Sequence, residues 1–304
     1  MCEDTDYESL PTTSLSLNMI AGALAGITEH TVTYPLDVLK TRTQFFANST
    51  TLYDNLAKSF ARIYSTEGMA SLWRGVNSVI LGSGPAHALY FGAYEFCKEK
   101  FKSIDASEHH HISHASAGAI ATLAHDGFLT PFDVIKQRMQ ISSQYRGLVH
   151  CASEVYRMEG FRAFYISYPT TIVMSVPFQA IQFTTYEYTR KLMNPSNQYN
   201  PLSHCVAGGL AGGMASLVTN PLDVAKTLLQ TKGLSTDVKL QNVNGLVDAF
   251  KLIYQQQGLI GFTRGVQARM LSNIPSTAVA WTTYEFLKMV LHKSSIPVPN
   301  NLEA

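Results

Sequence analysis

The 304-residue sequence is poor in charge, because Asp, Glu, Lys and Arg together make up only 15% of it, against about 25% in an average soluble protein. The ranges 76–94, 165–186 and 270–284 contain no charged residue at all. Stretches of ~17–25 such residues are long enough to cross a bilayer as helices. Ser, Thr, Gly, His and Gln interrupt them, which suits helices that face lipid on one side and a watery cavity on the other.

Other absences exclude several classes of protein. A net charge of +1 gives no electrostatic basis for a nucleic-acid partner. The four cysteines are scattered without a Cys-x-x-Cys pair, so neither a disulfide framework nor a zinc site is predicted. The acidic N-terminus has neither the basic start of a signal peptide nor the Arg-rich helix of a transit peptide, so we expect no cleaved presequence. No nucleophile–base pair or cofactor loop is visible, and we therefore expect neither an enzyme nor a bound cofactor.

One motif is present three times. Pro-x-Asp-x-x-Lys begins at Pro35, Pro131 and Pro221, and these prolines lie 96 and 90 residues apart. Each copy is followed by an amphipathic stretch (53–64, 145–156 and 244–254), a Glu-Gly or Gln-Gly pair, and a closing Tyr-Glu-x-x-Lys or Tyr-Glu-x-x-Arg. A period of about one third of the chain indicates three copies of one structural unit.

The motif predicts two rings of ion pairs. A proline inside a helix removes a hydrogen bond and kinks the axis, so three kinked helices are expected to converge where acids and bases of neighbouring repeats meet. The first ring would comprise Asp37, Lys40, Asp133, Lys136, Asp223 and Lys226. The second, at the opposite ends, would comprise Glu95, Lys98, Glu187, Arg190, Glu285 and Lys288. The alternative is that these are separate helix-end charges at a membrane surface.

These motifs resemble the mitochondrial carrier family over about residues 15–290. The resemblance implies an all-α membrane protein of the mitochondrial inner membrane, with six transmembrane helices in three pseudo-threefold repeats, each with a short matrix helix. The two rings would then be the matrix gate and the cytoplasmic gate of an alternating-access carrier. Leu228, in place of a basic residue, and Ile166-Ser167, in place of Arg-Gly, depart from the pattern.

The resemblance also divides the chain. We expect an N-terminal tail at 1–14, carrier repeats at 15–105, 106–195 and 196–293, and a C-terminal tail at 294–304. We expect a monomer in the lipid bilayer, with cardiolipin among its lipid partners.

A polar stripe is predicted near the middle of the membrane. Pro85, Pro177 and Pro275 each lie ten residues before the closing Glu of their repeat, and polar residues stand two positions before and after each proline. Because i and i+4 side chains share a helix face, these residues predict the lining of a cavity. The predicted substrate-binding residues are Ser83, His87, Met174, Ser175, Gln179, Ser272, Asn273 and Thr277.

The chemistry of this stripe favours a cation or a neutral solute. Carriers of anions need Arg or Lys, and Arg269, six residues before Pro275, is the only base near the midplane. Imidazole and thioether groups favour transition metals over Ca²⁺ or Mg²⁺. The predicted metal ligands, some of which would serve packing instead, are His30, His87, His125, Asp126, Met174 and His204.

The leading hypothesis is import of a transition-metal cation. Gly84-Pro85-Ala86-His87-Ala88, with His30 and Met174, resembles the mitoferrin branch of the family, which implies import of Fe²⁺ into the matrix. The closest alternative is a carrier of a neutral or cationic organic solute such as S-adenosylmethionine, and a proton-leak protein is the alternative from another class. The residues leave open Fe²⁺ against Mn²⁺, Zn²⁺ or Cu⁺, free against chelated metal, and coupling to protons.

Overall fold

The structure is a computed structural model that describes residues 15–45, 56–104, 110–193, 201–235, 237–273 and 275–276. Within these ranges all regular secondary structure is helical. The prediction of an all-α protein is therefore confirmed. Of the predicted site residues, His204 lies in a helix but its side chain is outside the described part, and Thr277, Glu285 and Lys288 are outside it altogether.

Each of the first two thirds of the chain contains a long helix, a short helix, a 3-10 turn and a second long helix, and the last third has the same order with a 3-10 turn and a further short helix added before its short helix. The first third comprises α1 (Leu15–Gln44), α2 (Leu56–Glu67), η1 (Met69–Trp73) and α3 (Val76–Ile104). The second comprises α4 (His110–Ile141), α5 (Leu148–Glu159), η2 (Phe161–Tyr165) and α6 (Tyr168–Met193). The last comprises α7 (Pro201–Thr231), η3 (Lys232–Leu234), α8 (Val238–Gln241), α9 (Leu246–Gln257) and η4 (Gly258–Thr263), followed by helical residues 266–273.

A glycine ends each of the short helices α2, α5 and α9. The three glycines, with their φ angles, are Gly68 (80°), Gly160 (76°) and Gly258 (63°). In each case the glycine N–H donates to the carbonyl of the tyrosine four residues earlier. Only glycine adopts this left-handed backbone without steric cost. The glycine therefore fixes the helix end, and the helices run about three residues beyond the tyrosines at which the amphipathic stretches were expected to stop.

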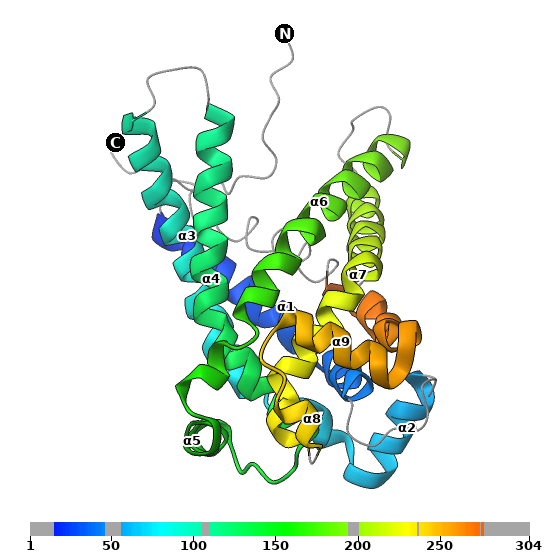
Figure 1. Cartoon of the computed structure of the whole chain (residues 1–304). Coiled ribbons are helices and arrows are strands. Elements are labelled where there is room, and N and C mark those ends of the chain that lie inside the picture. Colours follow the sequence, from blue (N-terminus) through cyan, green and yellow to red (C-terminus); the bar gives the residue numbers. More distant parts are fainter. Residues whose placement is uncertain are drawn as a thin grey trace, which may run out of the picture.

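All five described long helices contain an interior proline. Pro35, Pro131 and Pro221 lie in α1, α4 and α7, and Pro85 and Pro177 lie in α3 and α6. Figure 1 shows the α3–α4 and α6–α7 pairs diverging toward the top of the view, while α2, α5 and α8 lie at the bottom. We call the lower end, which holds the proline motifs, the motif end.

Each third of the chain has its own apolar cluster at the motif end. In the first, Tyr34, Val38 and Leu39 of α1 pack against Ile63 of α2 and Leu72 of η1. A second cluster joins α4 to α5 and η2, and a third joins α7 to α8 and α9. Burial of these side chains attaches each short helix to the long helix before it.

None of the helices in the described ranges contains a stretch both long and apolar enough to cross a membrane.

Candidate transport site

Acidic and basic side chains of the three proline motifs pair with one another at the motif end. The Nζ–Oδ2 distances are 2.9 Å for Lys40–Asp223, 2.9 Å for Lys136–Asp37 and 3.2 Å for Lys226–Asp133. Each pair joins two different repeats, so the three pairs link α1, α4 and α7 in a closed ring. The structure thus brings together all six residues predicted for the matrix gate; that they work as a gate stays a prediction.

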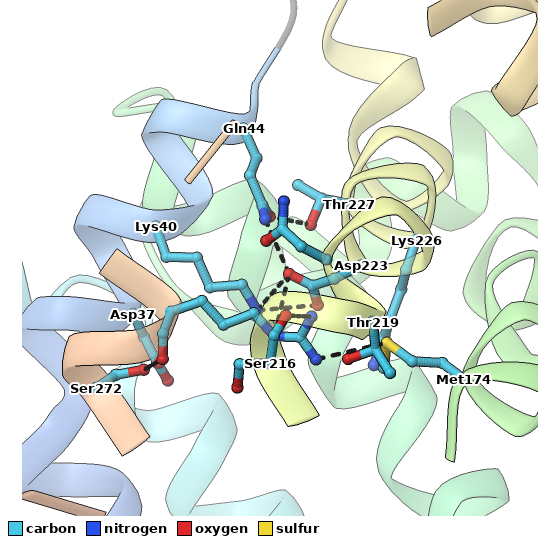
Figure 2. Close-up of polar contacts among 12 residues, drawn as sticks. Asp37, Lys40, Gln44, Met174, Ser216, Thr219, Asp223, Lys226, Thr227 and Ser272 are labelled. Carbon is cyan, nitrogen blue, oxygen red and sulfur yellow. Dashed lines mark hydrogen bonds and ion pairs between the residues drawn. The ribbon is translucent and has the colours of Figure 1, made fainter. Parts of the chain in front are cut away.

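Asp223 is the most heavily engaged acid of this ring. Its Oδ2 accepts a hydrogen bond from Gln44 Nε2 at 2.8 Å, and Thr227 Oγ1 donates to Gln44 Oε1 at 2.7 Å. Figure 2 shows Lys40 and Gln44 of α1 converging on Asp223, with Thr227 beside Gln44. Arg269 Nε lies 3.8 Å from the same Oδ2. Asp223 is therefore shared between a lysine and a glutamine of the first repeat and an arginine of its own repeat.

Two arginines hold neighbouring motifs together below the ring. Arg42 Nε donates to the carbonyl of Gln140 at 2.8 Å, and its guanidinium makes two further bonds to Glu67 of α2. Arg138 Nε likewise donates to the carbonyl of Gln230 at 3.0 Å, and the Arg138 guanidinium donates to Glu159 of α5. We call each such contact an arginine clasp. The third repeat has Leu228 at the arginine position and Gln257 at the glutamate position.

The ring predicted at the opposite end is not formed among the residues that are described. Glu95 lies 3.9 Å from Lys98 of its own helix, and Glu187 lies 3.5 Å from Lys191 rather than reaching Arg190. The side chains of Glu95 and Glu187 are 43% and 67% exposed. The structure is therefore closed by ion pairs at the motif end, whereas the described acids of the other ring pair within their own helices.

Three histidines from three helices lie side by side. The ring centroids of His30 (α1) and His87 (α3) are 6.5 Å apart, and those of His87 and His125 (α4) are 5.1 Å apart. The His87 and His125 rings are nearly perpendicular, at 88°. We call these three residues the histidine group.

Hydrogen bonds orient two members of the histidine group. Nδ1 of His87 lies 2.8 Å from the carbonyl oxygen of Ser83, and Nδ1 of His125 lies 3.0 Å from Asp126 Oδ1. Both acceptors require a proton on Nδ1, so in each neutral ring the lone pair is on Nε2. A histidine held through one nitrogen by a carboxylate or a carbonyl is the usual arrangement of a metal ligand.

Asp126 has both carboxylate oxygens occupied. Oδ1 faces His125, and Oδ2 lies 3.3 Å from Ser175 Oγ of α6, whose one proton is shared with the carbonyl of Thr171 at 2.9 Å. That Asp126 is a metal ligand stays a prediction; in this structure its carboxylate holds the His125 ring. Ser175, predicted as a substrate-binding residue, contacts this carboxylate.

Met174 lies with a different set of residues. Its sulfur accepts a contact from Arg269 Nη2 at 3.8 Å, and Arg269 Nη1 donates to the carbonyl of Ser216 at 3.2 Å. Asn273 Nδ2 donates to Ser216 Oγ at 2.5 Å, and Ser272 Oγ donates to the carbonyl of Arg269 at 2.9 Å. A fixed positive charge beside the thioether disfavours a metal cation there.

Two further predicted residues, Ser83 and Gln179, differ in their exposure to solvent. Ser83 is buried and Gln179 is exposed. Across the described ranges, no three His, Cys, Asp or Glu side chains are grouped as a metal site. One contact was not predicted: the Tyr90 ring lies 6.3 Å from His125 at 88°. Its position three residues after His87, on the same helix face, was the available signal.

The fold and this site together define a class of protein: three helical repeats closed by a ring of ion pairs around oriented polar side chains. A family model described as mitochondrial carrier protein matches residues 11–105, 107–197 and 197–295. The chain belongs to the mitochondrial carrier family, which places it in the mitochondrial inner membrane.

Individual relatives match over nearly the whole chain. An uncharacterized mitochondrial carrier of Schizosaccharomyces pombe is 48% identical, covering 96% of this chain and 97% of that protein. The protein named mitochondrial RNA-splicing protein MRS3 of Saccharomyces cerevisiae is 46% identical, covering 94% and 92%. Mitoferrin-1 of Homo sapiens is 44% identical, covering 96% and 88%. The predicted resemblance to the mitoferrin branch is thus confirmed.

Proposed function

We propose that this carrier imports a divalent transition metal, with Fe²⁺ as the cargo, into the mitochondrial matrix by alternating access. The observation that carries the proposal is the His87–His125 pair. Their rings lie 5.1 Å apart, and each is held through Nδ1 by an oxygen acceptor. Two neighbouring imidazoles that are each protonated on Nδ1 suit a borderline cation better than an organic solute.

The incompleteness of the histidine group supports transport rather than storage. A site that conducts an ion must bind it strongly enough to admit it and weakly enough to release it. Two or three imidazoles meet that need, and water completes the coordination of a transition metal. The similarity to proteins named mitoferrin favours iron among the metals that such ligands accept.

The gates supply the alternation. With the ion pairs of the motif end formed, as in this structure, cargo enters from the opposite end and reaches the histidine group. Separation of the three pairs would open the motif end to the matrix. Formation of the second ring, from Glu95, Glu187 and Glu285 with their basic partners, would then close the cytoplasmic end.

Uptake by proteoliposomes tests the proposal. Purified carrier is reconstituted under reducing conditions, and Fe²⁺ entry is followed together with the internal pH. We expect saturable Fe²⁺ uptake, competed by Mn²⁺ or Co²⁺. Uptake of S-adenosylmethionine without Fe²⁺ uptake would replace the metal assignment, and acidification without metal entry would replace it with a proton leak.

A further inference from the structure

Arg269 is a buried arginine next to the ring of ion pairs at the motif end. It is only 6% exposed, and its guanidinium contacts Asp223, the carbonyl of Ser216 and the Met174 sulfur. The guanidinium carbon also lies 5.7 Å from the centre of the Phe178 ring. Figure 2 shows the two first-repeat partners of Asp223, Lys40 and Gln44, on the side of α1.

The arginine exists in only one of the three repeats. It lies six residues before Pro275, and the equivalent positions before Pro85 and Pro177 hold Val79 and Thr171. Val79 packs in the apolar cluster of the first repeat, and Thr171 Oγ1 donates to the carbonyl of Ser167. Neither residue can offer a charge to Asp37 or Asp133.

Arg269 and Lys40 differ in what happens to them when the ring opens. Lys40 belongs to the first repeat and must leave Asp223 when the first and third repeats separate. Arg269 belongs to the same repeat as Asp223 and moves with it. A buried carboxylate that loses its partner is strongly unfavourable, so an arginine that stays behind lowers the cost of separating this pair.

The interface between the first and third repeats also differs from the other two in its arginine contacts. We call each of the three interfaces between repeats a seam. The arginine clasps join the first repeat to the second and the second to the third. The clasp that would join the third to the first is missing, because Leu228 has no donor and is buried with Val224 and Ile253. Four side-chain hydrogen bonds cross this seam through Asp223 or Gln44.

We propose that Arg269 is a positioning residue of the gate, and that it makes the seam between the first and third repeats the one that opens first. The inference rests on the gate role proposed above but not on the identity of the cargo. It adds an asymmetry that a threefold ring does not require.

Distances between spin labels test this asymmetry. Lys58, Ser143 and Lys239 are exposed, one in each repeat, on the segments of the motif end. We introduce these positions two at a time as cysteines into an otherwise cysteine-free full-length chain, which gives three variants. In lipid nanodiscs, double electron–electron resonance then measures the distance between the two labels across each seam. We expect the Lys58–Lys239 pair to have the largest long-distance population.

Substitutions then assign the effect to Arg269. Arg269→Gln should lower that long-distance population at least about tenfold, and Arg269→Lys should preserve most of it. Arg264→Gln, which removes another buried arginine of the same repeat, is the matched control. Thermal unfolding of each variant excludes misfolding as the cause.

Two results would overturn the proposal. One is equal lengthening of all three label pairs in the unsubstituted carrier. The other is an Arg269→Gln variant that matches Arg264→Gln in both label distances and transport rate. If the label distances show no opening, the uptake rate decides. The rate of Arg269→Gln must then lie at least about tenfold below that of Arg264→Gln, and Arg269→Lys must recover most of it. If the label distances are asymmetric but Fe²⁺ is not taken up, the assignment of Fe²⁺ as cargo is rejected and the role of Arg269 stands.

Discussion

At the residue scale, the informative contact is that between Asp126 and His125. An isolated imidazole reorients freely, whereas Asp126 holds Nδ1 of His125 and is itself held by Ser175 of another helix. Carboxylate partners of this kind fix the ring and raise its basicity as a ligand. We propose that Asp126 positions His125; its own role as a metal ligand stays a prediction.

Substitution of Asp126 should therefore weaken metal binding without removing it. We expect Asp126→Ala to weaken Co²⁺ binding about 10- to 100-fold, as is usual for the partner of a ligating histidine. Asp126→Asn should recover part of this, because an amide oxygen still accepts from Nδ1. Titration of the purified carrier with Co²⁺, followed by its absorption bands, measures the change. Asp248→Ala, at an exposed acid of α9, is the control, and equal affinities in the two Ala variants would refute the positioning role.

At the element scale, the ring joins α1, α4 and α7 in one direction only. Lys40 pairs with the acid of the third repeat, Lys136 with that of the first, and the remaining lysine with that of the second. The sequence alone allows each aspartate to pair with the motif lysine of either of the other two repeats. The handedness with which the helices are arranged decides between them.

A charge exchange tests this pairing. Asp133→Ala or Lys226→Ala leaves a charge unpaired where helices meet, so transport should fall at least about tenfold. Exchange of the two, Asp133→Lys with Lys226→Asp, restores the pair and should recover part of the rate. The control exchange is Asp133→Lys with Lys136→Asp, residues of the same repeat that are not partners here. Equal recovery in both exchanges, measured as uptake by liposomes, would show that the observed pairing is not the functional one.

The attachment of α2 to α1 should depend on pH. Hydrogen bonds from Arg42 hold the pKa of the Glu67 carboxyl below its ordinary value, and Arg74 adds to the effect. Since the folded-state pKa is depressed, this pair stabilises the fold above about pH 4.3, the ordinary value for Glu, and the contribution is lost as pH falls through the folded-state pKa.

Thermal unfolding of Glu67→Gln measures this dependence. We expect the substituted carrier to be less stable than the natural one at pH 7, and the difference to shrink at about pH 3.5. Glu154→Gln in α5 serves as the control for loss of a carboxylate. A stability difference that stays constant between the two pH values would contradict the account of this pair.

At the scale of the whole molecule, the repeat pattern was the part that sequence predicted best. Three copies of the Pro-x-Asp-x-x-Lys motif indicate three similar units, and prolines at equivalent positions predict kinks and polar stripes without any knowledge of contacts. The ends of the short helices were predicted about three residues early, because a glycine in the left-handed region, and not the aromatic residue before it, stops the helix. The role of Arg269 was not predicted, because its partners Asp223, Ser216 and Met174 lie at least 46 residues away in the chain.

The departures from threefold symmetry are also where function can differ between repeats. The histidine group draws on the first and second repeats, while Arg269 and the missing clasp belong to the third. A carrier that binds its cargo beside two repeats and opens at the seam of the third would use its three units for different tasks. Metal binding at His87 is the claim on which this division rests.

The most direct test of that claim is the initial rate of Fe²⁺ uptake by liposomes that contain His87→Ala. His150→Ala, at an exposed histidine of α5, is the matched control, reconstituted at equal density under the same reducing conditions. Because loss of a partner to a ligand alone costs about 10- to 100-fold in affinity, loss of the ligand itself should lower uptake at least about tenfold, with insertion and thermal stability unchanged. An uptake rate for His87→Ala equal to that of His150→Ala would contradict a metal site at the histidine group.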